Sequence, residues 1–182
     1  MTRSEFMKCC TAGMCSCGAV AFLSPQTALA DSANPELESL KWKLDFVQRR
    51  FAGLVRILNE NVDGTVLKKI WESQGREHAR EYRDLTDKYK GDIEGFLNDI
   101  RGRWVESAEY DAARGTIRVV DKSPTCTCPL VRQNVTPPSF CDCTLGWQKE
   151  AYSAVVGRPV EATLEESILR GGKRCVFRIQ IL

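Results

Sequence analysis

The spacing of apolar residues predicts a series of helices in the first half of the chain. Between Pro35 and Asn61 apolar residues recur every three or four positions, as on one face of an amphipathic helix. This repeat consists of Leu37, Leu40, Leu44, Val47, Phe51, Leu54, Val55 and Leu58. Thr65 is placed to cap a second helix, which we expect Gly75 to break or end. Residues 76–90 are dominated by charge, which indicates a solvated helix, and a third apolar repeat follows over residues 92–100.

After Gly102 the pattern changes to the alternation that is typical of strands. Gly157 ends a short predicted helix at residues 145–156, and Gly171-Gly172 is a hairpin turn signal. Strands are expected at residues 104–110, 116–120, 160–169 and 174–182. This order predicts an α+β fold, in which N-terminal helices pack on an antiparallel sheet of about four strands with one inserted helix. We expect a single domain over residues 31–182, with helices at 35–103 and the β/α/β part at 104–182.

Composition and charge exclude some classes of function. The chain has 182 residues, of which 43% are hydrophobic and 27% charged, as in ordinary globular domains. Its formal net charge is +2 and no basic stripe stands out, so we expect no nucleic-acid partner.

The first thirty residues resemble a secretory signal. A charged start precedes an apolar run from Cys9 to Leu23, and Ala28 and Ala30 form a small-x-small cleavage site that would leave Asp31 as the new N-terminus. Residues 2–8 are similar to a twin-arginine export signal, except that Ser4 stands where the second arginine belongs. The apolar run is too short for a stable membrane anchor. We therefore expect residues 1–30 to be an export signal and the remainder to lie outside the cytoplasm, with no transmembrane anchor.

Nine cysteines fall into two groups, one in each terminal part of the chain. The first group is Cys9, Cys10, Cys15 and Cys17. If the N-terminus is retained, these thiols form a metal-binding or redox patch, and the protein is a cytosolic cysteine-ligated metal or redox protein.

The second group contains two Cys-x-Cys pairs, Cys126 with Cys128 and Cys141 with Cys143, separated by twelve residues. Four thiolates can surround one Zn²⁺ ion, although paired zinc ligands are more often two or more residues apart. Alternatively the four cysteines form two disulfides, which an exported protein favours, and the sequence does not choose among the three possible connectivities. Zinc is therefore a possible cofactor, and disulfides or free thiols are the alternatives.

Other candidate residues have weaker support from the pattern. Cys175 alternates with inward-facing Phe177 and Ile179, which indicates a buried thiol that packs as a small hydrophobe. His78 is the only histidine, and its charged surroundings indicate an exposed helical residue. The adjacent residues Glu165 and Glu166 on one strand are expected to point to opposite faces, so they do not form a carboxylate pair.

Aromatic residues next to the second cysteine group are candidates for a ligand pocket. Trp147 and Tyr152 lie on the predicted helix that follows Cys143. Side chains of this kind pack in cores, but near a group of thiols they also line apolar cavities. We therefore take Trp147, Tyr152 and Cys175 as candidate ligand-binding residues, and Cys143 and Cys175 as candidate catalytic thiols.

A set of short motifs in the last third of the chain resembles known families. The motifs are Cys143-x-x-Gly146-Trp147, Gly157, residues 160–164 (Val-Glu-Ala-Thr-Leu), Gly171 and Cys175-Val176-Phe177-Arg178-Ile179. Together they resemble the end of the 4-vinyl reductase, or hydrocarbon-binding, domain, whose members bind small apolar ligands and in some cases carry a metal at their cysteines. Ser167 stands where that family usually has another cysteine. The L-2-amino-thiazoline-4-carboxylic acid hydrolase-like family is similar here, and also has N-terminal helices.

These observations favour an exported, non-enzymatic domain that binds a small apolar molecule between its sheet and helices. The resemblance and the absence of a catalytic triad are its basis. The cysteine group would then stiffen the loop over the pocket. The first alternative is a thiol-dependent or metal-assisted hydrolase of the L-2-amino-thiazoline-4-carboxylic acid hydrolase type, using Cys143 or Cys175. The second is the cytosolic metal or redox protein.

Overall fold

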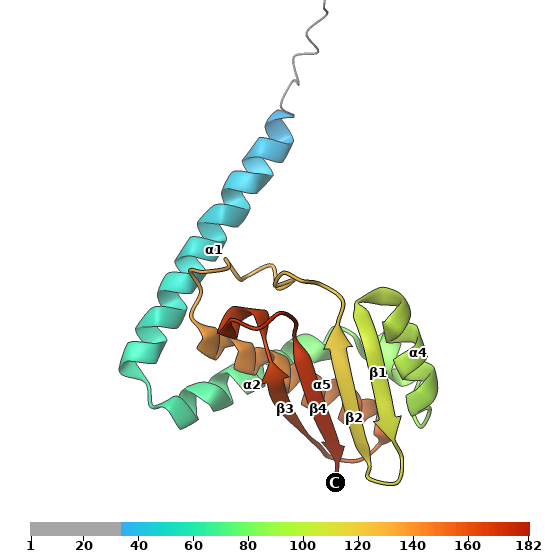
Figure 1. Ribbon diagram of the computed structural model, residues 1–182. Coiled ribbons are helices and arrows are strands. Elements are labelled where there is room, and N and C mark those ends of the chain that lie inside the picture. The colour runs from blue at the N-terminus through green and yellow to red at the C-terminus, as the bar shows by residue number, and fades with distance from the viewer. Residues whose placement is uncertain (1–33) are drawn as a thin grey trace, which may run out of the picture. The chain divides into compact units, whose positions relative to one another are not determined.

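The computed structural model describes residues 34–182 (Figure 1). The predicted export signal, its cleavage site and the four N-terminal cysteines lie outside the described residues. The predicted α+β class is confirmed: helices pack on a four-stranded antiparallel sheet.

Helix α1 (Pro35–Asn61) begins at the predicted Pro35 and ends within the predicted region near Asn61 to Gly64, but only part of its apolar stripe is covered. In its C-terminal half Ala52 and Val55 are fully buried, and Val55 belongs to the same core cluster as Leu67 and Trp71 of helix α2 (Gly64–Arg80). Nearer its N-terminus the helix exposes large apolar side chains, namely Leu37, Leu40, Trp42, Leu44, Phe46 and Val47. The stripe is therefore buried only where α2 and its neighbours lie beside it.

The structure corrects both predicted ends of the second helix. Asp63, rather than Thr65, is the N-cap of α2, and its Oδ1 accepts hydrogen bonds from the backbone N–H groups of Thr65 (2.9 Å) and Val66 (3.2 Å). Gly75 does not end the helix, which continues to Arg80. A Cβ at Gly75 would collide with the backbone carbonyl of Cys143, so this glycine allows a close contact between helices.

Two shorter helices complete the N-terminal half. The charged stretch forms the end of α2 and helix α3 (Arg83–Lys88). The third apolar repeat forms helix α4 (Ile93–Arg103), and Asp92 caps it by accepting a 2.9 Å hydrogen bond from the backbone of Gly95. The apolar positions of α4 are buried against the sheet.

The sheet contains β1 (Val105–Asp111), β2 (Thr116–Asp121), β3 (Val160–Glu166) and β4 (Val176–Ile181) in the order β1-β2-β4-β3, all antiparallel. The third strand is shorter than predicted, because its last residues form the 3-10 helix η2 (Ile168–Arg170). Gly171 follows η2 with a φ of 89°, a conformation that favours glycine.

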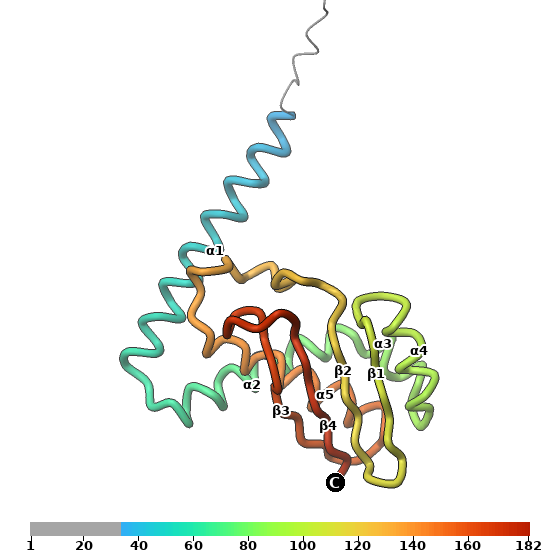
Figure 2. Tube along the Cα trace, in the orientation of Figure 1, coloured from blue at the N-terminus to red at the C-terminus, as the bar shows by residue number. Residues whose placement is uncertain are grey.

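The inserted helix α5 (Asp142–Val156) is confirmed between β2 and β3. It follows the β2–η1 loop (residues 122–137) and the 3-10 helix η1 (Pro138–Cys141), a path that can be followed in Figure 2. Helices α2 and α5 lie behind the sheet in Figure 1. Buried Lys149 of α5 links this helix to α2 and to β3. Its Nζ lies 3.1 Å from a carboxylate oxygen of Glu72 in α2 and 2.8 Å from one of Glu161 in β3.

The two faces of the sheet differ in polarity. The face toward the helices is apolar, whereas on the other face Glu165 pairs with Arg118 (3.3 Å) and Arg178 (2.5 Å). Glu166 instead accepts hydrogen bonds from the backbone N–H groups of Lys173 and Arg174. The two adjacent carboxylates therefore have separate structural partners.

Buried apolar residues form two clusters. The sheet cluster consists of Phe96, Leu97, Ile100, Val105, Ala108, Ile117, Val119, Leu145, Tyr152, Val155, Val160, Ala162, Phe177, Ile179 and Ile181. The helix–loop cluster consists of Val55, Leu67, Trp71, Val131 and Phe140, with Cys126, Cys128 and Cys143 packed against it.

Within residues 34–182, no helix combines the length and apolar character needed to cross a bilayer.

Candidate functional site

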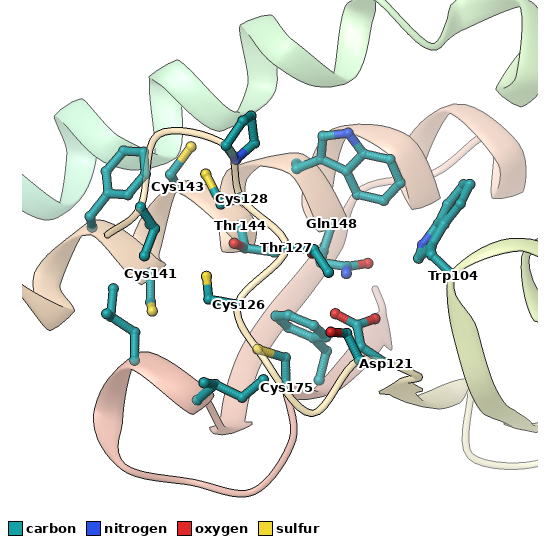
Figure 3. Close-up of a pocket in the computed structure, with 18 of the residues that line it drawn as sticks. Trp104, Asp121, Cys126, Thr127, Cys128, Cys141, Cys143, Thr144, Gln148 and Cys175 are labelled. Atoms are coloured by element: carbon teal, nitrogen blue, oxygen red, sulfur yellow. The ribbon is translucent and has the colours of Figure 1, made fainter. Parts of the chain in front are cut away.

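A cavity of about 390 Å³ lies where the two clusters meet (Figure 3). Its wall combines the end of β2, the β2–η1 loop, η1, one side of α5, η2 and the start of β4. Phe140 comes from the helix–loop cluster and Phe177 from the sheet cluster. The exposed residues His78, Tyr82 and Thr144 also line it, so the cavity opens to solvent. Its volume falls in the range of small-molecule sites.

All five cysteines of the second group line this cavity: Cys126, Cys128, Cys141, Cys143 and Cys175. The first two come from the β2–η1 loop, the next two from the junction of η1 with α5, and Cys175 directly precedes β4. In Figure 3 the sulfur atoms of Cys128 and Cys143 lie close together, with Cys126 between them and Cys175. The fold thus gathers residues that are up to 49 positions apart in the chain.

Burial makes four of these thiols poor nucleophiles. It raises the pKa of Cys143 to about 12 and that of Cys175 to about 11, and it also raises the pKa of Cys128 and Cys141. Repulsion between neighbouring thiolates adds to the effect, for example from Cys128 on Cys143. With these pKa values the candidate catalytic residues Cys143 and Cys175 are protonated at neutral pH. Because the thiolate is the reactive form, neither is an activated nucleophile.

Among residues 34–182 the cysteines form neither disulfides nor a set of metal ligands. All five thiols are free, and the Cys141 Sγ lies 3.5 Å from the hydroxyl oxygen of Ser167. In the described part of the chain no group of three or more His, Cys, Asp or Glu residues is placed to hold a metal ion. The disulfide and zinc arrangements of these cysteines stay predictions.

The structure separates the candidate aromatic residues. Trp147 lines the cavity, with its ring 6.2 Å from that of Trp104 and 6.0 Å from that of Tyr82. Tyr152 lies instead in the sheet cluster, where its ring packs edge-on against Phe96 at 5.3 Å, and it does not line the cavity. Of the predicted ligand-binding residues, Trp147 and Cys175 therefore reach the cavity.

One end of the cavity carries a carboxylate, Asp121, at the end of β2. Burial raises the pKa of Asp121 to about 6. Its backbone N–H donates a 3.0 Å hydrogen bond to the carbonyl of Cys175, whereas among residues 34–182 its side chain has no hydrogen bond or ion pair. Burial also raises the pKa of Tyr152, and repulsion from Asp121 contributes.

A second polar side chain, Gln148 of α5, lines the same end. Only 5% of the residue is exposed, and in the described part of the protein its Oε1 is buried without a hydrogen-bond partner. Figure 3 shows its amide end turned toward the carboxylate of Asp121, with Trp104 beyond them. A buried amide oxygen without a partner costs roughly 1–3 kcal/mol, so a ligand that satisfies it recovers part of that free energy.

Sequence reasoning missed Asp121 and Gln148, although the signals were present. Asp121 continues the alternation of Ile117 and Val119, which places it on the face of β2 that packs against the helices. Gln148 stands between Leu145 and Tyr152 at helical spacing, on the buried face of α5. His78 was correctly predicted to be exposed, but its place at the opening of the cavity depends on the tertiary structure.

Comparison with known proteins yields structural similarity only. No protein-family model matches the chain, and no curated protein matches it. Among solved structures it is similar to a trafficking protein particle complex subunit 3 from Naegleria fowleri covalently bound to palmitic acid, with a TM-score of 0.47 and 14% identity over 78% of this chain and 96% of that one. It is also similar to the phenol-responsive sensory domain of the transcription activator PoxR with phenol, with a TM-score of 0.44 and 11% identity over 74% of each chain. Similarity at this level says nothing about the ligand of this chain. The resemblance to the 4-vinyl reductase and hydrolase-like families stays a prediction.

Proposed function

We propose that this protein binds a small apolar molecule in the thiol-lined cavity. The observation that carries the proposal is the cavity itself, a hollow of about 390 Å³ between the two hydrophobic clusters. Aromatic side chains of Phe140, Phe177, Trp104 and Trp147 surround it. Binding sites for small molecules typically combine an apolar wall of this kind with a few polar groups.

In this proposal the thiols line the cavity and do not react with the ligand. A protonated cysteine behaves as a small, polarisable hydrophobe, and the raised pKa values of Cys143 and Cys175 keep both protonated at neutral pH. In their protonated form Cys143 and Cys175 therefore add apolar surface and contribute no charge.

The direct test is binding of ethylbenzene and 4-ethylphenol, measured by thermal unfolding and by tryptophan fluorescence. A ligand present at a hundred times its Kd stabilises the folded state by about 2.7 kcal/mol, which is seen as a higher Tm. Trp104 and Trp147 line the cavity, so their emission is expected to change on binding. If neither compound alters the Tm or the emission, the proposal is wrong.

A filled-cavity variant shows whether binding occurs at this site. Cys126→Phe places a ring in the wall of the cavity and is expected to abolish the shift in Tm. Val135→Phe is the matched control, because Val135 is exposed in the same loop and does not line the cavity. Equal binding by both variants would place the ligand elsewhere.

The alternative of a thiol-dependent hydrolase has less support. No described contact joins His78 to any cysteine; its ring packs against Tyr82 instead. With a pKa of about 12, Cys143 carries roughly a thousandth of the thiolate of an ordinary cysteine at pH 8. Iodoacetamide is therefore expected to alkylate Cys143 about a thousand times more slowly in the folded than in the unfolded protein. Fast alkylation of Cys143 would instead support the hydrolase alternative.

Export is a proposal that rests on the sequence alone. If residues 1–30 are removed, the intact mass of protein from its native cell corresponds to a chain that begins at Asp31. A full-length mass would instead favour the cytosolic alternative. Alkylation of the denatured sample shows in the same experiment whether the cysteines were free or joined in disulfides.

A further inference from the structure

The polar end of the cavity contains two hydrogen-bonding side chains that have no hydrogen-bond partner among residues 34–182. Oε1 of Gln148 is buried, and the carboxylate of Asp121 faces the same space from β2. The groups come from different elements, α5 and β2, and they share one end of a cavity that is otherwise mostly apolar. Groups of this kind are normally paired in folded proteins.

We propose that the cavity binds an aromatic molecule carrying one neutral hydrogen-bond donor, such as a hydroxyl group, whose O–H is shared between two acceptors, the amide oxygen of Gln148 and the carboxylate of Asp121. This inference rests on the proposed function and specifies its class of ligand. The ring of the ligand lies among the aromatic side chains, and its hydroxyl lies at the polar end.

The chemistry of the two anchors selects a donor over an anion. The amide oxygen of Gln148 accepts hydrogen bonds, and an ionised carboxylate at Asp121 is an acceptor only. The pKa of Asp121, raised to about 6, leaves this group mostly ionised at pH 7.5. An anionic head group would meet a like charge there, and an unsubstituted hydrocarbon would leave Gln148 without a partner.

The test compares three probes with the same ethylbenzene body and different head groups. At pH 7.5 we expect 4-ethylphenol to bind about tenfold more tightly than ethylbenzene, and 4-ethylbenzoate to bind most weakly, as measured by titration of tryptophan fluorescence. A hydrogen bond to a charged or buried acceptor commonly accounts for a factor of about ten.

The outcomes separate this inference from the proposed function. If the three probes bind equally well, or if the benzoate binds most tightly, the cavity is a ligand site but the donor class is wrong. If none of the three binds, the proposed function itself fails. Tighter binding of ethylbenzene than of 4-ethylphenol would also overturn the inference.

Substitution of the anchors supplies the second arm of the experiment. Gln148→Met keeps the length of the side chain and removes the unpaired amide, so the fold is expected to persist. Its preference for 4-ethylphenol over ethylbenzene should fall from about tenfold to less than threefold, with little change in the affinity for ethylbenzene. Asp121→Leu should also lower the preference.

The chain offers a matched control for these substitutions. Ser139 likewise has a buried hydroxyl without a partner in the described part of the chain, but it does not line the cavity. Ser139→Ala is therefore expected to keep the tenfold preference. Loss of the preference in Ser139→Ala, or its retention in Gln148→Met, would contradict the role assigned to Gln148.

Discussion

The sheet cluster and the helix–loop cluster use different kinds of backbone, and this difference locates the cavity. Every member of the sheet cluster belongs to a regular helix or strand, and residues such as Phe96, Ile117 and Ile179 are fully buried. The helix–loop cluster includes Val131 from an irregular loop and Phe140 from a single 3-10 turn. Regular elements interdigitate at close to crystal density. The loop instead spans the gap between them and leaves a hollow beneath it.

The comparison also explains why thiols and polar groups gather at the boundary. The β2–η1 loop contributes Cys126 and Cys128 as small side chains, which do not fill the volume between η2 and α5. Asp121 is the last residue of β2, at the edge of the sheet cluster. A binding site therefore arises where regular packing stops.

Close contact between α2 and α5 joins the two clusters. Breaking this contact is expected to have the largest effect on the free energy of unfolding. Gly75 of α2 and Gly146 of α5 leave no room for a Cβ, because the backbones of Cys143 and Glu72 occupy that space. Gly75→Ala should lower the free energy of unfolding by about 3 kcal/mol or more, at the upper end of overpacking effects. Chemical denaturation of the variant measures it.

A glycine elsewhere provides the control for this substitution. Gly53 lies inside α1 with open space around its Cα, so Gly53→Ala should raise stability by about 1 kcal/mol through helix propensity alone. If Gly75→Ala is likewise stabilising, the close contact does not constrain the helices, and the two clusters are joined by other contacts.

Much of the fold followed from the sequence, because period and burial agree in regular elements. The start of helix α1 and the region in which it ends were predicted, and the four strands with the inserted helix were placed within a few residues. The errors arose where tertiary contact overrides local preference. Gly75 was expected to end a helix, since glycine is a poor helix former, but the neighbouring helix requires it there.

The candidate site was predicted less completely. The sequence indicated that the cysteines and Trp147 belong together, because motif spacing is visible along the chain. Asp121 and Gln148 were missed, since each looks like an ordinary polar residue until β2 and α5 are packed together. Tyr152 was chosen for its closeness in sequence to the thiols, but its position on α5 turns it into the sheet cluster.

Asp121 lies at the boundary of the clusters, and substituting it should have the second-largest effect on the free energy of unfolding. This effect depends on pH. Its folded pKa of about 6 exceeds the ordinary 3.8, so the folded state holds this proton more tightly than the unfolded state. The contribution to stability is therefore complete below about pH 4 and is lost as the pH rises through 6, with a total of at most about 3 kcal/mol. Asp121→Asn should be more stable than the wild type at pH 7.5, with a smaller advantage at pH 4.

Chemical denaturation of both proteins at pH 4 and at pH 7.5 measures this difference. Cys175 and Tyr152 also feel the charge of Asp121, but burial raises the pKa of each, so neither titrates in this range. Identical pH profiles for Asp121→Asn and the wild type would show that burial of this carboxylate is not costly.

The smallest expected effect concerns how the β2–η1 loop is held against α1. Arg132 of the loop forms an ion pair with Asp45 of α1, with 2.7 Å between Nη1 and Oδ1. The side chain of Gln48 in α1 donates a 2.9 Å hydrogen bond to the carbonyl of Pro129. Because the ion pair is half exposed, Arg132→Ala should lower the free energy of unfolding by less than about 1 kcal/mol.

Within the loop, however, the amides of residues 131, 135 and 136 should exchange with solvent about two- to fivefold faster in Arg132→Ala, while those of β4 are unchanged. Hydrogen exchange measures this, with Arg114→Ala at the β1–β2 turn as the exposed-pair control. Faster exchange throughout the sheet would mean that the loop and the sheet cluster unfold as one unit, and the distinction between the two clusters would then concern packing alone.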